Sequence, residues 1–262
     1  MLFDLKGKRK RFVQVTYVAL AFLFAIGLVG FGVGGGTGGG GILDAITGNG
    51  GGGGSSSSSG VLKRYERAVQ VHPKSESAWL DLLRAEYAAA TAGNDYDRNT
   101  GQFSEGAAPS LSRAAQAWEK YLALKPKRPD IGAANIIVQV YATLLRLGKG
   151  SPFDELKRAG EAQEIVAKRQ PSAIAFYQLA NISYVSGNFD KADRAGKKAL
   201  ALTPKDQRNT VKSQLDEARK QGLKLKKEAK SAREQATKAA RDARKKGQDP
   251  FGASPVQPSV GQ

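Results

Sequence analysis

The side chains of this chain that could bind a metal gather in one loop, NDYDRNTGQFSEG at residues 94–106. Its candidate ligands are the carboxylates and amide of Asp95, Asp97, Asn99 and Glu105. Oxygen ligands at alternate positions suit Ca²⁺, whose helix–loop–helix sites require glycine at the sixth loop position and a bidentate glutamate at the twelfth. Counted from Asp95, Gly101 is seventh and Glu105 eleventh. Calcium binding is therefore an alternative to a polar insertion in which these side chains shape turns.

Residues suited to catalysis are sparse. The sequence has no cysteine and a single histidine, His72, directly before Pro73 in an expected turn between helices. A zinc site or a nucleophile with its base would require further histidine or cysteine side chains. The acidic residues are scattered among basic ones, which is typical of solvated helix faces. We therefore expect a protein that is not an enzyme and holds no cofactor.

The periodic segments of the sequence predict paired helices. No segment shows the alternating pattern of a β-strand. The clearest pair lies at residues 173–204, on either side of a Gly187-Asn188 turn. Bulky and small residues recur there at helical spacing, namely Phe176, Leu179, Ala180, Ala192, Ala199 and Pro204. Such spacing gives each helix a small-residue face toward the other and predicts a module that stacks on further copies.

This pattern resembles the tetratricopeptide-repeat (TPR) family, although Ser183 holds the place of the family's usual tyrosine and Tyr184 follows it. Partial matches are a half unit at 64–73 and two units at 76–126 and 131–171, with insertions at 93–109 and 149–153. The residues that match the motif there include Trp79, Leu82, Ala114, Trp118, Pro126, Ala159, Val166 and Pro171. The resemblance covers about residues 61–206 and implies an all-α solenoid of helix hairpins.

The resemblance also implies a groove that is lined by the first helix of each repeat. The residues that it places on this groove are Arg84, Tyr87, Tyr177, Asn181 and Tyr184. Such side chains could hold an extended peptide by hydrogen bonds and aromatic packing, and the basic surroundings favour an acidic segment of a protein partner. For each tyrosine, packing between helices is an equally open alternative.

A membrane anchor is predicted near the N-terminus. Residues 12–33 form an uncharged apolar run of 22 residues, long enough to cross a hydrocarbon layer of about 30 Å as a helix. Residues 1–11 are basic, whereas Asp44 is the only charged residue of the 29 that follow the run. The positive-inside rule then predicts a single-pass cell-membrane protein with a cytoplasmic N-terminus and exported repeats. A cleaved signal peptide is the alternative, disfavoured because the run is long and no A-x-A site follows.

Two segments have the composition of disordered chain. Residues 34–60 are mostly glycine and serine, interrupted by the short apolar stretch 42–46, and predict a flexible linker. Residues 247–262 contain Pro250, Pro255 and Pro258 and predict a disordered tail.

The basic character of the chain is concentrated near its C-terminus. Residues 205–246 contribute nine of the 17 formal net positive charges, and we expect a capping and extended helix over 207–246. Apolar or small residues follow a heptad spacing at Val211, Leu215, Ala218, Gly222, Leu225, Ala229, Ala232, Ala236, Ala239 and Ala243. The first part of this helix should cover the end of the repeats. For the remainder, the alternatives are a solvated helix, weak self-association through the 211–243 seam, or contact with anionic lipid or cell-wall polymer.

Together these features predict a membrane-anchored, non-catalytic protein–protein interaction scaffold that binds a partner segment through a TPR groove. The alternative is a structural envelope protein whose basic C-terminal helix binds anionic lipid or cell-wall polymer. Nucleic acid is not expected as a ligand, because the basic helix lacks aromatic stacking residues and a recognised nucleic-acid motif.

Overall fold

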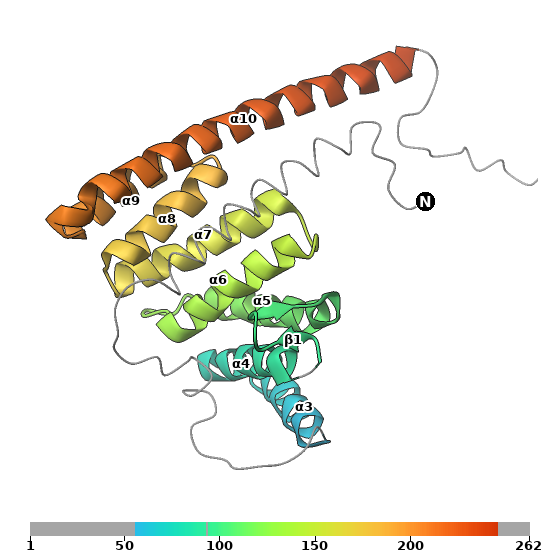
Figure 1. The fold of residues 1–262 in the computed structure, drawn as a ribbon. Coiled ribbons are helices and arrows are strands. Elements are labelled where there is room, and N and C mark those ends of the chain that lie inside the picture. Colours follow the sequence, from blue (N-terminus) through green and yellow to red (C-terminus); the bar gives the residue numbers. More distant parts are fainter. Residues whose placement is uncertain (1–55, 93, 246–262) are drawn as a thin grey trace, which may run out of the picture.

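The computed structural model describes residues 56–92 and 94–245, which form an all-α fold apart from one short β-ribbon (Figure 1). Its α-helices are α3 (Ser56–Val71), α4 (Glu76–Ala92), α5 (Ala108–Ala123), α6 (Ile131–Arg146), α7 (Pro152–Arg169), α8 (Ala173–Val185), α9 (Phe189–Leu202) and α10 (Arg208–Lys245). Two short 3-10 helices, η1 (Glu105–Ala107) and η2 (Lys205–Gln207), precede α5 and α10. The predicted all-α class is therefore confirmed.

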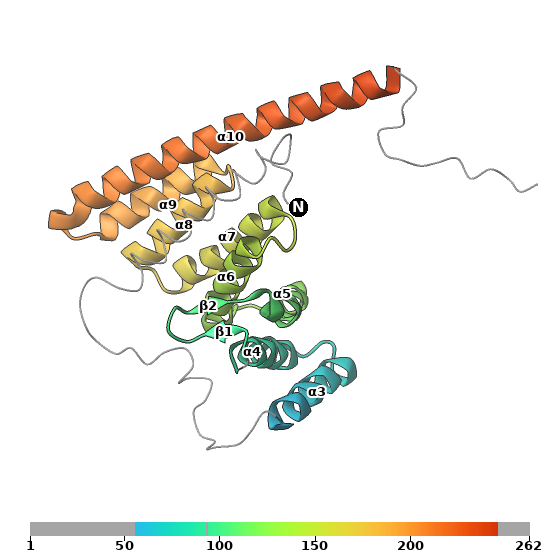
Figure 2. The same ribbon diagram turned by 45° about the vertical axis from the view of Figure 1, so that its right-hand side comes forward.

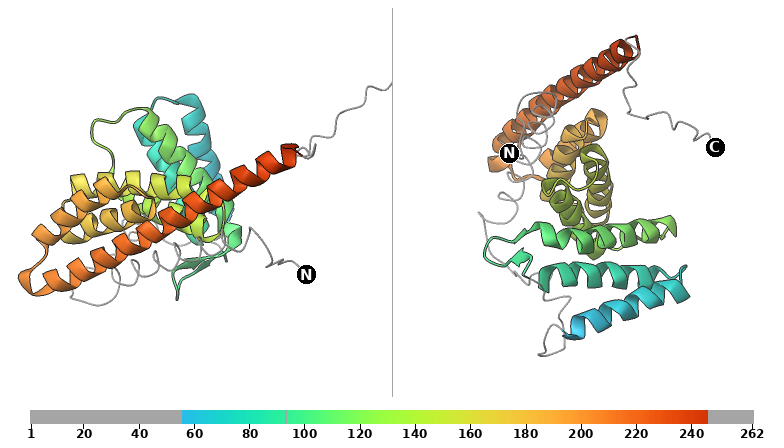
Figure 3. Two further views of the ribbon diagram at one scale, coloured as in Figure 1. Left: turned by 90° about the horizontal axis from the view of Figure 1, so that it is seen from above. Right: turned by 90° about the vertical axis from the view of Figure 1, so that its right-hand side faces the viewer.

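Consecutive helices pack as hairpins, in the pairs α4–α5, α6–α7 and α8–α9. Each hairpin also contacts the next one, through α5 with α6 and through α7 with α8. The pairs follow one another from α3 at one end to α10 at the other, as the two turned views show (Figures 2 and 3).

Small residues allow this close packing. Several alanines of the helix interfaces are fully buried, among them Ala114, Ala133, Ala134, Ala162, Ala180, Ala192 and Ala199. At Gly160 of α7, an added Cβ would lie 3.3 Å from the Ile182 side chain of α8. The large side chains that complete the core include Trp118, Tyr121 and Tyr141, each at most 2% exposed.

The insertion between α4 and α5 forms a β-ribbon that the sequence analysis did not predict. Its strands are β1 (Tyr96–Asp97) and β2 (Gln102–Phe103), paired antiparallel with Tyr96 opposite Phe103. The Phe103 ring is buried, with its centroid 6.1 Å from that of Tyr87 and 4.8 Å from that of Tyr96. The Phe103 carbonyl also accepts a hydrogen bond from the Arg146 guanidinium of α6. The insertion is thus fastened to both α4 and α6.

The long helix α10 has two different parts. Its heptad residues Leu215, Ala218, Gly222 and Leu225 are buried, and the helix contacts α8 and α9. At Gly222 an added Cβ would lie 2.5 Å from the Tyr184 carbonyl oxygen, so only glycine permits this approach to α8. The C-terminal part of α10 runs past the ends of α8 and α9 (Figure 1).

Several predictions fall on residues that the structure does not describe. They concern the basic segment 1–11, the apolar run 12–33, most of the linker and the tail 247–262. At Ser56, α3 already begins inside the segment expected to be linker. Among the described residues, no helix combines the length and the apolar character that a membrane crossing requires.

Candidate partner-binding face

The first helices of the three hairpins begin in the same way. Ser75, Asp130 and Ser172 each accept a hydrogen bond through a side-chain oxygen from the backbone N–H three residues later. The distances are 3.3 Å to Ala78 N, 2.7 Å to Ala133 N and 3.1 Å to Ala175 N. These are N-cap contacts, which fix where each helix starts. Positions counted from the caps can therefore be compared between α4, α6 and α8.

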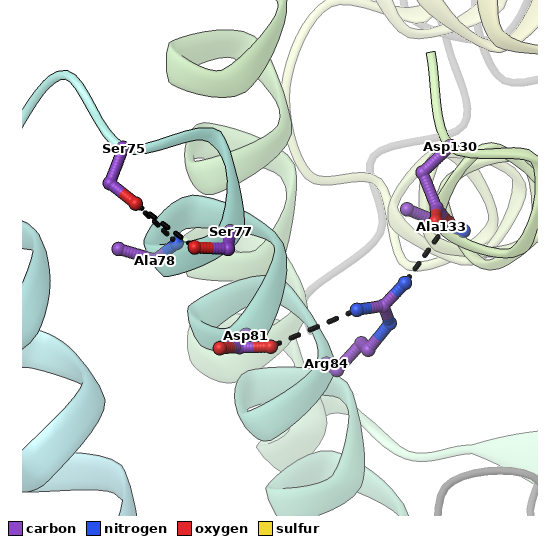
Figure 4. Close-up of polar contacts among 7 residues, drawn as sticks. All are labelled: Ser75, Ser77, Ala78, Asp81, Arg84, Asp130 and Ala133. Atoms are coloured by element: carbon purple, nitrogen blue, oxygen red, sulfur yellow. Dashed lines mark hydrogen bonds and ion pairs between the residues drawn. The ribbon is translucent and has the colours of Figure 1, made fainter. Parts of the chain in front are cut away.

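Arg84 joins α4 to the cap of α6 (Figure 4). Its guanidinium lies 3.1 Å from the Asp130 carboxylate and 3.8 Å from that of Asp81. The Asp130 backbone N–H in turn donates to the Tyr121 hydroxyl at 2.9 Å. The Arg84 side chain is 33% exposed, so it remains at the surface of α4 while two carboxylates offset its charge. The surface of α4 around Arg84 is therefore not strongly basic.

Tyr87 lies in the interior and not on an open surface. It is 8% exposed, and its hydroxyl donates to Gln139 Oε1 of α6 at 2.9 Å. Burial, together with the neighbouring Tyr96, raises the pKa of Tyr87 to about 12. Its ring meets the Phe103 ring of the insertion edge-on. For Tyr87, the structure shows the packing alternative instead of the predicted groove position.

Tyr184 and Asn181 of α8 are also buried, at 4% and 0% exposure. The Tyr184 hydroxyl donates to Asp193 Oδ1 of α9 at 2.6 Å, and Arg219 of α10 lies 3.5 Å from the same oxygen. Burial and the hydrogen bond to Asp193 raise the pKa of Tyr184 above its usual range. The Asn181 amide has no hydrogen-bond partner among the described residues. The expectation that these two residues line an open groove is thus wrong for this conformation, since the closely packed hairpin and the docked part of α10 leave α8 little free surface.

Tyr177 is half-exposed and packs in part against the core. It is the fifth residue after its cap, and the equivalent residues of α4 and α6, Leu80 and Asn135, are half-exposed as well. At the ninth position Arg84 and Gln139 are half-exposed, whereas Asn181 is covered. Leu80, Asn135 and Gln139 were missed from the sequence. The shared caps would have revealed them, because they set the common register.

The residues predicted to pack the repeats occupy the following places. Leu82, Ala114, Trp118, Phe176, Leu179, Ala180, Ala192 and Ala199 are buried. Trp79 is half-buried and donates through its indole N–H to the Pro73 carbonyl at 2.9 Å. Pro126 is half-buried, and Pro204 is exposed directly before η2.

The oxygen-rich loop uses its carboxylates internally. Asp97 accepts hydrogen bonds from the Asn99 backbone N–H at 2.8 Å and from the Thr100 hydroxyl at 2.7 Å, and these bonds lower the pKa of Asp97. The Asp95 carboxylate accepts a hydrogen bond from the Ser104 hydroxyl, and Glu105 is the first residue of η1. Over the described ranges, no group of three or more histidine, cysteine or acidic residues is placed to hold a metal ion. In this structure the loop side chains shape turns.

Two buried carboxylates that the sequence did not single out lie close to arginines, Glu86 across the α4–α5 pair and Glu155 within α7. Glu86 of α4 is fully buried and accepts from Arg113 Nε of α5 at 2.5 Å. Glu155 of α7 is buried with Arg158 at 3.9 Å, and burial raises the pKa of Glu155. Neither carboxylate faces open solvent, so neither is placed to act on a substrate.

No protein-family model and no curated protein sequence matches this chain. The face along α4, α6 and α8 therefore has to be judged on its own geometry. It presents amide, guanidinium and aromatic groups at equivalent positions of successive helices.

Proposed function

We propose that this chain is a membrane-anchored, non-catalytic interaction scaffold, in which a TPR-like solenoid binds an extended segment of a protein partner. The observation that carries the proposal is the common N-cap register of α4, α6 and α8. It supports a face with a regular repeat along the stack, which is the arrangement that an extended ligand requires.

The chemistry of this face suits a peptide backbone. Asn135 and Gln139 carry amides that donate and accept hydrogen bonds, and Arg84 adds donors. Leu80 and Tyr177 are half-exposed apolar groups against which side chains of the segment can pack. Because Asp81 and Asp130 offset the charge of Arg84, this face gives little support to the expectation of an acidic partner.

The partner-binding part of the proposal is tested by a differential capture experiment on the full chain. We expect the Arg84→Ala, Tyr177→Ala double variant to lose most of the partner captured by the parent protein, as measured by quantitative mass spectrometry. The control is Lys157→Ala at an exposed position of α7. Equal capture by parent and double variant, with unchanged thermal unfolding, would remove the face assignment.

The anchor rests on the apolar run 12–33 and its basic flank. It is tested with single cysteines, since the chain has none of its own. A cysteine at Lys74, in the exposed turn before α4, should react with a membrane-impermeant maleimide in intact cells. A cysteine at Lys8 should react only after lysis. The opposite pattern would place the repeats in the cytoplasm.

A further inference from the structure

Six basic side chains form a stripe on α10 outside its buried seam, and four of them lie on the side opposite the seam. They are Lys220, Lys224, Lys227, Lys230, Lys238 and Arg241, all exposed. At 3.6 residues per turn, Lys220, Lys224, Lys227 and Lys238 lie about 140–160° around the helix from Gly222, which packs against α8, and the other two lie about 80–100° from it. We call these six residues the basic stripe. At a rise of 1.5 Å per residue it is about 32 Å long.

Little on the protein itself neutralises the basic stripe. Within the described residues its one ion pair joins Lys230 to Glu234 at 3.9 Å, and both side chains are more than 60% exposed. Such a pair is weak in water. Most of the stripe also lies on the part of α10 that runs past the neighbouring helices (Figure 1), so no other described helix covers it.

One apolar side chain lies within the stripe. Leu223, between Lys220 and Lys224, is 50% exposed, whereas Leu225 on the seam side is 7% exposed. A leucine among lysines can enter the boundary between lipid headgroups and acyl chains while the lysines contact phosphates. The charged backbone of a nucleic acid or of another polyanion offers it no comparable apolar layer.

We propose that the basic stripe of α10 docks on the surface of a bilayer that contains anionic phospholipid, with Leu223 inserted between the headgroups. Five of the six basic residues are lysine, whose compact charge suits a fluid headgroup layer better than bidentate recognition of one phosphate. In addition, α10 contains no aromatic residue on which bases could stack.

The chain length permits this docking on the membrane that holds the anchor. Residues 34–55 lie between the apolar run and α3, and 22 residues reach up to about 75 Å when extended. The helix layers from α3 to α10 span roughly 40–50 Å at 8–10 Å per layer. Docking on that same membrane rests on the anchor of the proposed function. The charge pattern of α10 is independent of the anchor.

The test uses the full chain with a fluorophore on Ser231→Cys, a half-buried serine of α10 close to the stripe. The protein is reconstituted in neutral phosphatidylcholine vesicles or in vesicles with 30% phosphatidylglycerol, both with a quencher in the headgroup layer. We expect quenching only in the vesicles that contain phosphatidylglycerol. This quenching should be lost in 0.5 M KCl, because salt screens the attraction between the lysines and the lipid. Equal quenching in neutral vesicles, or none in either, would overturn the proposal.

Matched variants separate charge from insertion. Lys220→Gln, Lys224→Gln and Lys227→Gln together should lower the docked-to-free ratio about a hundredfold, at about fivefold per lysine. The control removes three exposed lysines elsewhere, Lys120→Gln, Lys157→Gln and Lys197→Gln, and should leave docking unchanged. Leu223→Ser should weaken docking by about tenfold. An equal effect of the two triple variants, or no effect of Leu223→Ser, would contradict the stripe.

Two further measurements identify the polyanion and isolate the anchor. A 20-base-pair DNA duplex that changes the Ser231→Cys signal more than phosphatidylglycerol vesicles do would assign the stripe to nucleic acid and overturn the proposal. A full chain that fails to float with neutral vesicles would contradict the anchor of the proposed function. Salt-sensitive flotation of that same chain with phosphatidylglycerol vesicles would still support the stripe.

Discussion

The two halves of α10 share one heptad pattern but differ in their surroundings. In the first half, Leu215, Ala218, Gly222 and Leu225 are buried against the stack. In the second half, the sequence supplies only alanine at the seam positions, and the helix leaves the stack (Figure 1). The heptad periodicity therefore specifies the helix throughout, and it does not by itself specify that the helix docks. Because it is buried, the first half of the seam is not free for self-association.

The largest expected effect separates two neighbouring leucines of α10. Leu225→Ala should lower the free energy of unfolding by about 2–4 kcal/mol, because Leu225 is buried in a cluster with Leu145, Leu156 and Val185. Leu223→Ala should change it by less than about 0.5 kcal/mol, since Leu223 is half-exposed. Urea unfolding followed by circular dichroism measures both. A loss of less than about 0.5 kcal/mol for Leu225→Ala would show that α10 does not dock through Leu225.

The next expected effect is that replacing glycine by alanine raises the free energy of unfolding at one position and lowers it at another. Alanine in place of glycine inside an exposed helix stabilises it by up to about 1 kcal/mol. Gly60→Ala in α3 should follow this rule, because an added Cβ there meets nothing within 4 Å. Gly222→Ala should instead destabilise by about 1–2 kcal/mol, because its Cβ would meet the Tyr184 carbonyl oxygen at 2.5 Å. Stabilisation by both substitutions, in the same unfolding assay, would disprove the close approach of α10 to α8.

A smaller effect is expected from the hydroxyl that joins α8 to α9 beside α10. Tyr184→Phe removes the 2.6 Å hydrogen bond to Asp193 and should lower the unfolding free energy by about 1–1.5 kcal/mol. Tyr177→Phe, at a half-exposed tyrosine of the same helix, serves as the control and should be nearly neutral. Thermal unfolding distinguishes them. Unchanged thermal stability of Tyr184→Phe would mean that this hydrogen bond does not stabilise the packing of α8 on α9.

The smallest expected effect is a pH dependence of stability that comes from the buried carboxylate of Glu155 in α7. The raised pKa of Glu155 means that the folded state binds its proton more tightly than the unfolded state. The contribution of Glu155 to stability therefore falls as the pH rises through the interval between its unfolded and folded pKa values. The stability difference should shift in favour of Glu155→Gln as the pH rises from about 4 to 7. Urea unfolding of both proteins at each pH measures this difference, and a difference that stays constant from about pH 4 to 7 would contradict the burial of this charge.

The sequence was sufficient for the helix pair at 173–204, because its signals are local. The Gly187-Asn188 turn and the small-residue spacing of 173–204 marked α8 and α9 closely. The ribbon at 96–97 and 102–103 was missed because it is too short for an alternating pattern.

The candidate face was harder to predict, since exposure depends on neighbours that are distant in sequence. Tyr87 is covered by Phe103 of the insertion, and Tyr184 lies beneath Gly222 and Arg219 of α10. Arg84 and Asn181 occupy the same position after their caps, yet Asn181 is covered and Arg84 is not. A motif register assigns a helix face, but it does not tell what packs on that face.

The most direct test of the partner-binding face is site-specific photo-cross-linking in cells. A photoreactive phenylalanine derivative at Asn135 of α6 would lie on the proposed face, and the same group at the exposed Lys157 of α7 provides the control. We expect a discrete cross-linked partner from Asn135 that is absent from Lys157 and is lost in the Arg84→Ala, Tyr177→Ala double variant. A partner that cross-links from Lys157 and not from Asn135 would contradict the account.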